Sequence, residues 1–474
     1  MPRGMTSGRP RLPDRSITGA VQLIGVVVAG GLILGGLTLQ TAMPAPAQRA
    51  LAVFLATAML WLTKPVPLGV SSLLSVTALV GFGVVPTFEA AAAGYASRIV
   101  FFLLVLLLLG EAIQRVGLDG RLARRLLARP TTPRGSVIRL SGYMLLAGLF
   151  MPSGIARTVT FIPIVDRLNE LYDLGEQNDF LRASFLLVGQ VNPIGSLALM
   201  TGGGMAILSS EIIRVEVTPI TWLGWALHML IPVVLIYAIA TLVVLWVFPV
   251  PAGPAASSTT VTATPMDRDQ RIVALTMTAT IGLWLVGSVT GLSTIVPPLL
   301  AVAVLTAPGV RILEASDIRR VNWNILLLFG AIMSLIAALQ STGALAMVID
   351  RVLEVVPLLT LPTAAAVAMV LAGVVLIRLF FSTASASLAI MLPVVITVAG
   401  TLGVDPLAFT LATVLIVGST TLVPFHLPTV LLVAEHYEPL RVRDVLVVGL
   451  ISLAAAAVVT AGTWLVVWPV IGLS

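Results

Sequence analysis

The sequence predicts an all-α polytopic membrane protein, with about eleven transmembrane helices and two re-entrant hairpins in an inverted repeat. Of its 474 residues, 58% are hydrophobic and only 10% are charged, which is more apolar surface than one soluble core encloses. Apolar runs of about 20 residues recur, each long enough to cross a bilayer as a helix. The alternating pattern of a membrane β-barrel is missing, and one order of elements occurs twice.

The charge and composition exclude several classes of function. The net charge of +6 is explained by loop arginines held against an anionic membrane surface, so the lipid bilayer is the expected partner and nucleic acid is not. The chain has no cysteine, and its three histidines are too scattered for a metal cluster. Neither a nucleophile with its base nor a metal site is spaced for catalysis. The sequence therefore predicts no enzyme, no metal and no cofactor.

Residues 1–48 are predicted to form a tail and a first anchor helix. Several arginines precede an apolar run over residues 17–39, and this run is longer than the core of a typical cleaved signal peptide. The "APAQ" after it resembles a small-residue cleavage site, so removal of the segment stays the alternative. As an anchor, its basic end is expected to lie inside the cell.

Residues 49–248 are predicted to form the first half of a repeat. Spans are expected near residues 49–63, 67–86 and 98–116, followed by a basic surface segment. Two short apolar arms then suggest a re-entrant hairpin over residues 138–171. The half ends with two further elements, a broken helix at 181–208 and a full span at 221–248.

Residues 249–270 are rich in Pro, Ala, Ser and Thr, which is typical of a flexible linker, and we expect it in the cytoplasm. After it the order of elements starts again. Residues 271–474 are predicted to form the second half, with a hairpin at about 362–400 and a broken helix at 406–434.

Matching segments support the repeat. "EAIQRVGLDGRLARRLL" parallels "AALQSTGALAMVIDRVL", and "SGIARTVTFIP" parallels "TASASLAIMLP". A hairpin followed by an interrupted helix in each half is the pattern of secondary transporters, whose site lies where the interruptions meet. Arginine-rich loops place the amino terminus in the cytoplasm and the carboxyl terminus outside a cell membrane, so the two hairpins enter from opposite sides.

Several motifs together resemble a known family. They are "WLTKPVPLGVSSLL", "VNWNILLLFGAIMSLIAALQSTG", the hairpin endings "IPI" and "LPV", and "LVPFHLPTVLLVAEHYEPLRVRDVLVVGL". The chain resembles the divalent anion:sodium symporter family, solute carrier family 13 and its bacterial relatives. That resemblance implies a homodimeric permease that moves a small anion by an elevator mechanism. An anion channel, or a transport-inactive membrane sensor with the same fold, stays the alternative.

The sequence departs from this family where the family holds sodium. The family has Ser-Asn-Thr at both hairpin tips, but here residues 153–155 are Ser-Gly-Ile and residues 383–385 are Thr-Ala-Ser. The family also has Thr-Pro-Pro-Asn in its two broken helices. This chain has Thr-Gly-Gly-Gly at residues 201–204 and Leu-Pro-Thr-Val at residues 427–430 instead. Sodium coupling through the usual positions is therefore not expected, although sodium stays open as an alternative beside proton coupling, exchange and uniport. Among dicarboxylate, citrate, sulfate and other oxyanions, the loss of both asparagines argues most against a dicarboxylate.

Arg157 is the leading site candidate because it follows the first tip inside an apolar stretch. A guanidinium there can replace the charge of sodium or bind an anion through its planar fork of donors. The alternative is a structural arginine that snorkels to the interface or pairs with Glu111. An uncompensated charge in a membrane costs at least about 2.5 kcal/mol, which favours a functional role.

The other predicted substrate-binding positions carry hydroxyls or glycines at the tips and interruptions, or follow the second interruption. They are Ser153, Gly154, Thr158, Gly195, Ser196, Thr201, Gly202, Thr383, Ser385, Ser387, Pro428 and Thr429. Hydroxyls in membrane helices often only bond their own backbone, which is the competing interpretation. Glu111 and His426 are candidates for proton coupling. Asn192 either joins the site or satisfies backbone groups freed by Pro193, and Arg378 is expected to anchor at the membrane interface.

Overall fold

The computed structural model describes residues 15–39, 41–121, 131–148, 151, 153–253, 265–356 and 358–473. Within these residues the chain forms helices and loops, with no strand, which confirms the predicted all-α class. Most of the predicted basic surface segment, and residues 254–264 of the predicted linker, lie outside the described residues.

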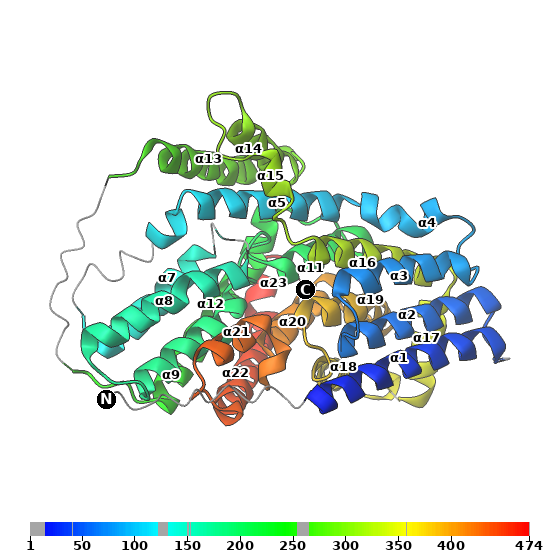
Figure 1. The fold of residues 1–474 in the computed structure, drawn as a ribbon. Coiled ribbons are helices and arrows are strands. Elements are labelled where there is room, and N and C mark those ends of the chain that lie inside the picture. Colours follow the sequence, from blue (N-terminus) through cyan, green and yellow to red (C-terminus); the bar gives the residue numbers. More distant parts are fainter. Residues whose placement is uncertain are drawn as a thin grey trace.

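The first half begins with helices that match the predicted spans closely. They are α1 (Arg15–Thr38), α2 (Ala45–Thr63), α3 (Leu68–Gly81), α4 (Phe88–Ala92), the 3-10 turn η1 (Ala93–Ala96) and α5 (Arg98–Arg115). Helix α1 packs against α2, and both lie at one end of the molecule in Figure 1. The outward side chains of α1 are large and apolar, Leu23 being 65% exposed, as suits a helix that faces lipid.

The next helices contain the first predicted hairpin and broken helix. They are α7 (Pro133–Ala147), α8 (Gly154–Tyr172), α9 (Asp179–Leu186), the π-helical turn η2 (Leu187–Val191), α10 (Asn192–Gly195), α11 (Gly204–Glu216) and α12 (Trp222–Val247). Helices α7 and α8 pack against each other, and α9 to α10 run on without a break. The helical path is interrupted at residues 196–203, inside the predicted broken segment.

The second half follows the same order of elements. Its elements are α13 (Arg268–Thr290), α14 (Val296–Thr306), α15 (Ala315–Ile318), α16 (Trp323–Ser341), α17 (Ala344–Val355), η3 (Leu358–Thr360), α18 (Thr363–Arg378), α19 (Ala384–Leu402), α20 (Pro406–Ser419), η4 (Pro424–His426), α21 (Pro428–His436), α22 (Val442–Gly462), η5 (Thr463–Val467) and α23 (Trp468–Val470). The second interruption separates α20 from α21.

Side chains that the sequence places before each apolar run explain where several helices begin. The Thr221 hydroxyl accepts a bond from the Gly224 amide at 3.0 Å, ahead of α12. Asp405 accepts from the Ala408 amide at 2.7 Å, ahead of α20. Such N-caps satisfy amides that the first turn of a helix leaves unpaired, so they fix the start of each helix.

Seven helices in the described part of the chain are long and apolar enough to cross a membrane, or eight if the bent pair α4–η1 and α5 is one span. This supports a multi-pass membrane protein. The predicted number of eleven spans, and the re-entrant nature of the α7–α8 and α18–α19 pairs, remain predictions.

Helix α5 connects several parts of the molecule. It packs against α14 and α16, which belong to the second half, and against α11. Figure 1 shows α5 running beneath α13 and α14. Helix α16 also packs along α3 and η1, so the two halves of the chain share one core rather than forming separate units.

One close contact between η1 and α16 occurs at Gly94. Its amide donates to the Ser334 hydroxyl at 3.1 Å. A Cβ at Gly94 would lie 2.2 Å from the Gly330 carbonyl oxygen and 2.5 Å from the Ser334 amide nitrogen. Both obstacles are backbone atoms of α16, so neither can rotate away.

Gly94→Ala is expected to lower the free energy of unfolding by about 3 kcal/mol, because it overpacks this contact. The measurement is the melting temperature of the detergent-solubilised protein. Gly142→Ala in α7 is the control, since a Cβ there meets nothing within 4 Å. Equal melting temperatures for both variants would show that η1 and α16 do not pack this closely.

Candidate functional site

A cavity of about 450 Å³ lies among helices from both halves of the chain. Residues at the amino-terminal ends of six helices line it. They are Pro67 and Leu68 of α3, Ser153 and Gly154 of α8, Gly203 and Gly204 of α11, Asn322 and Asn324 of α16, Thr383 and Ala384 of α19, and Leu427 and Pro428 of α21. Both predicted tips and both interruptions therefore meet here.

The convergence of helix starts gives the cavity its electrostatic character. Amides in the first turn of a helix lack intrahelical partners, and the helix dipole places about half a positive charge at that end. Among the described residues that line the cavity, none is acidic and none is basic. An anion is thus the ligand that this arrangement favours.

The remaining lining combines hydroxyls, amides and apolar side chains. Five hydroxyl residues line it, namely Ser153, Ser196, Thr383, Ser385 and Thr429. Apolar walls come from Leu103 and Leu107 of α5 and from Leu328 and Phe329 of α16. A mainly apolar cavity with a few convergent polar groups is typical of a small-molecule site.

Arg157 lies directly behind the α8 end of this cavity and is 0% exposed. Its Nε donates to the Asn192 side-chain oxygen at 2.8 Å, and its Nη2 donates to the Ser196 hydroxyl. Its Nη1 donates to the carbonyls of Met151 and Gly202. These acceptors are all neutral, so within the described residues the guanidinium charge has no carboxylate partner.

The guanidinium acts on the cavity through Ser196 and Gly154. Because the Ser196 oxygen accepts from Arg157, the hydroxyl hydrogen is left to donate to a ligand. A Cβ on Gly154 would lie 3.8 Å from Arg157 Nη2 and 3.9 Å from the Ser196 oxygen. Asn192 donates to the Gly154 carbonyl at 3.1 Å, so it fixes both the arginine and the start of α8. Asn192 is thus a supporting residue of the site.

Arg157 neither snorkels to an interface nor pairs with Glu111, which were the two alternatives to a role at the site. Full burial excludes snorkelling to an interface, and Glu111 is not among the groups that contact the guanidinium. Glu111 lies near the end of α5 and does not line the cavity.

Seven of the predicted binding residues line the cavity. They are Ser153, Gly154, Ser196, Thr383, Ser385, Pro428 and Thr429. Ser153, Thr383 and Ser385 are partly exposed to it. The Thr429 hydroxyl instead donates to the Gly189 carbonyl at 2.6 Å, so that group holds α21 against η2.

Two residues that were predicted to bind the substrate through their hydroxyls donate to backbone carbonyls instead, and neither lines the cavity. Ser387 donates to the Ala384 carbonyl at 2.8 Å in its own helix. Thr158 donates to the carbonyl of Val188 at 3.0 Å. Backbone bonding of this kind is common for Ser and Thr in helices, and it leaves both residues a structural role.

Thr201, Gly195 and Gly202 also lie outside the lining. The Thr201 hydroxyl accepts from the Trp222 indole at 3.2 Å. Gly195 allows close packing, since a Cβ there would lie 3.2 Å from the Tyr237 ring. Gly202 contributes its carbonyl to Arg157, as described above.

His426 is buried with both ring nitrogens bonded. Its Nδ1 accepts from the Leu422 amide at 3.2 Å, and its Nε2 lies 3.0 Å from the Leu379 carbonyl, to which it can only donate. This arrangement is that of the neutral ring, and it leaves no ring nitrogen open to relay a proton.

Sequence reasoning missed the contribution of α3 and α16. Asn322 and Asn324 line the cavity, and the Asn324 side-chain oxygen accepts from the Gly69 amide at 3.0 Å. The signal was present, since both asparagines stand in "VNWN" immediately before a long apolar run. Only the packing of α16 on α3 shows that this end faces the same cavity as the hairpin tips.

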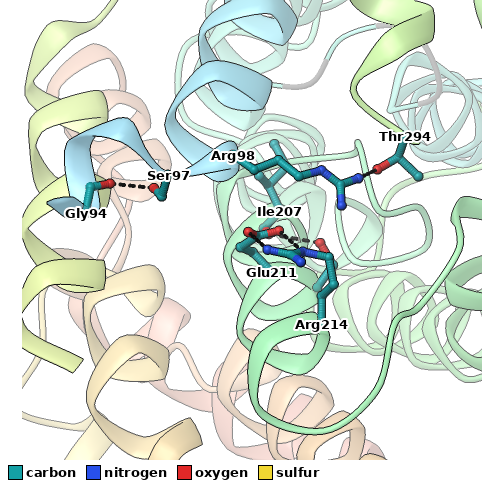
Figure 2. Close-up of polar contacts among 8 residues, drawn as sticks. Gly94, Ser97, Arg98, Ile207, Glu211, Arg214 and Thr294 are labelled. Carbon is teal, nitrogen blue, oxygen red and sulfur yellow. Dashed lines mark hydrogen bonds and ion pairs between the residues drawn. The ribbon is translucent and has the colours of Figure 1, made fainter. Parts of the chain in front are cut away.

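Charged groups farther along α11 are compensated. Figure 2 shows Arg214 bonded to Glu211, with Nη2 to Oε1 at 2.6 Å, while Arg98 at the start of α5 donates to Thr294. Arg214 thus pairs with Glu211, one of the two acidic residues on α11, whereas Glu216 at the end of the helix accepts a hydrogen bond from Gln340.

Comparison with known proteins identifies the family. Residues 19–473 match the family described as the sodium:sulfate symporter transmembrane region. The chain belongs to this family. It is a membrane transporter rather than an enzyme, in agreement with the sequence prediction.

Relatives are distant but extend over most of the chain. It is 24% identical to dicarboxylate transporter 1 of Arabidopsis thaliana chloroplasts, over 82% of this chain and 72% of that protein. It is also 24% identical to the putative malate transporter YflS of Bacillus subtilis, over 70% of this chain and 72% of that one. The crystal structure of the Alcanivorax borkumensis YdaH transporter has the same fold, with a TM-score of 0.52 at 17% identity and coverage of 96% and 98%.

Asn192→Asp tests whether the guanidinium charge matters to the cavity. The carboxylate keeps an acceptor for Arg157 but neutralises its charge, so a small anion such as sulfate is expected to stabilise the variant at least about tenfold less effectively than the parent protein. The readout is the melting temperature as a function of the concentration of this anion. Asn169→Asp, near the other end of α8, is the control, because it likewise replaces an amide that donates to a backbone carbonyl, here that of Gly175. Equal stabilisation of both variants would mean that the charge does not reach the ligand.

Proposed function

We propose that the protein is a secondary active transporter that moves a small dianion across the cell membrane, without sodium at the usual positions. The observation that carries this proposal is the meeting of six helix amino termini, backed by Arg157, on one cavity that no acidic side chain lines in the described residues. Each helix start adds positive potential where water is scarce, so the sum favours negative charge.

The division of the cavity walls supports an elevator mechanism. One wall comes from α3, α5 and α16, and the other comes from the two proposed hairpin tips and the two interruptions. In our proposal residues 49–248 and 271–474 are inverted repeats, and α7–α12 with α18–α22 move past the remaining helices. In this proposal the substrate moves with the hairpin tips. A homodimer, with amino termini inside and carboxyl termini outside, completes the proposal.

The first tip argues against a sodium ion. An inorganic cation there would need the oxygens nearest the turn, but the carbonyls of Met151 and Gly202 already accept from Arg157. The guanidinium thus already binds the oxygens that an inorganic cation would use. Its positive charge is permanent. We propose that it supplies the positive charge of the site.

The names of the relatives make a dicarboxylate the first candidate, with sulfate next. Several relatives are named as dicarboxylate or malate transporters, and the family is described by sulfate. The sequence argued against a dicarboxylate because the tips lack asparagine. Asn322 and Asn324 offer amide donors from α16 instead, which removes much of that objection. A cavity of about 450 Å³ also has room for a four-carbon dianion.

Reconstituted proteoliposomes test the transport function. Uptake of labelled succinate, malate and sulfate is expected to saturate and to show counterflow, with no response to an imposed sodium gradient. A pH gradient is imposed separately. Flux without saturation or counterflow would indicate a channel, and binding without flux would indicate a sensor. Strict sodium dependence would overturn the proposed role of Arg157.

Arg157→Gln is expected to raise the KM for succinate at least about tenfold, because it removes the charge behind the cavity while retaining some hydrogen bonding. Arg157→Lys is expected to retain more activity than Arg157→Gln. The control is Arg167→Gln on the same helix, whose parent side chain is 60% exposed and pairs with Glu170. An unchanged KM in Arg157→Gln would show that the site does not use this charge.

A further inference from the structure

A second arginine is fully buried, at the end of α18. Arg378 is 0% exposed, which corrects the sequence-based expectation that it anchors at the membrane interface. Its Nη1 donates to the Phe381 carbonyl and its Nη2 donates to the His426 carbonyl, the latter at 3.0 Å. Its Nε has no partner among the described residues. A buried cation with an unbonded nitrogen calls for an explanation beyond packing.

Two of the four hydrogen bonds of Arg157 have counterparts at Arg378, although the bonds to Asn192 and Ser196 do not. Each guanidinium donates to one carbonyl in the turn between two hairpin helices, at Met151 or Phe381. Each also donates to one carbonyl in the following interruption, at Gly202 or His426. In both halves, an arginine therefore joins the hairpin turn to the broken helix.

The two arginines reach this arrangement from different sequence positions. Arg157 follows its turn, in the first part of α8, whereas Arg378 precedes its turn, at the end of α18. Equivalent residues of a repeat would stand at matching positions. The shared geometry therefore reflects a shared requirement for positive charge at these two points.

The acceptors of Arg378 are neutral. Both are backbone carbonyls, and no ion pair among the described residues includes this arginine. The His426 ring, held neutral between Leu379 and Leu422, contributes no charge. Phe381 and His426 stand within two residues of Thr383 and Leu427, which line the cavity. The charge is thus uncompensated and lies just behind the second half of the site.

We infer that Arg378 is a positioning residue for the substrate, acting as the second of two fixed cations, and that together the two guanidiniums match the two charges of a dianion. This inference rests on the proposed transport function. Arg378 holds the α18–α19 turn against the α20–α21 interruption, so the start of α19 and the start of α21 face one ligand. Its positive charge reaches the cavity through those helix starts rather than by direct contact.

The test compares a dianion with a monoanion of similar shape. Succinate and its monomethyl ester are transported by proteoliposomes containing the parent protein, Arg378→Gln or Arg378→Lys. Arg378→Gln is expected to raise the KM for succinate at least about tenfold, and to change the KM for the monoester much less. Arg378→Lys keeps the charge and is expected to restore the preference for the dianion. A purely structural role would change both substrates alike and would overturn the inference.

Chemical rescue gives a second readout. Arg378→Ala leaves the Phe381 and His426 carbonyls facing a space of guanidinium size, so millimolar guanidinium is expected to restore succinate uptake. The control is Arg351→Ala on α17, whose parent side chain is 72% exposed and pairs with Glu354. A folded Arg378→Ala variant that guanidinium does not restore would count against the inference. If Arg378→Ala does not fold, the comparison of Arg378→Gln with Arg378→Lys decides.

The failure of this inference differs from the failure of the proposed function. If the parent protein moves neither succinate nor sulfate, the proposed function fails. If the parent protein moves succinate while Arg378→Gln keeps the parental ratio of the two KM values, transport stands and only the role of Arg378 fails.

Discussion

The buried guanidinium of Arg157 is the interaction on which the arrangement of the site depends. Its bonds to Asn192, Ser196 and the carbonyls of Met151 and Gly202 join α8, α10 and the loop that interrupts the helical path before α11. A charge removed from water is tolerated only where several acceptors converge on it. The interruption of the helix provides two such acceptors, Ser196 and Gly202, and the hairpin turn provides a third, Met151. The break in the helix and the buried charge therefore stabilise each other.

The same logic connects the site to the rest of the fold. A helix that stops inside a membrane leaves amides and carbonyls without partners, which lipid cannot satisfy. Here the carbonyls beside the breaks accept from arginines, whereas the amino-terminal ends of the helices line the cavity. The positive ends of these helix dipoles then favour an anion. Carbonyls in the interruptions thus hold the arginines and stabilise the fold, whereas the helix starts that follow the interruptions line the site for the ligand.

Much of the fold follows from local sequence. Apolar length, together with the glycines and prolines of the interruptions, gave helix positions that agree closely with the structure. The site was predicted only in part. Ser153 and Ser385 line the cavity, but Ser387 and Thr158 bond backbone, because one hydroxyl in a helix can satisfy either a ligand or a nearby carbonyl. Sequence does not show which of these it contacts.

By itself the sequence determined that this is an all-helical membrane protein and that an arginine lies inside it beside a hairpin tip, since composition and spacing are local properties. Only the tertiary structure decided what that arginine contacts, that Arg378 is buried like it, and that Asn322 and Asn324 of α16 share the cavity. Each of these depends on contacts between segments far apart in the chain. The physical reason is that burial and charge compensation are set by the packing of helices, which no single stretch of sequence contains.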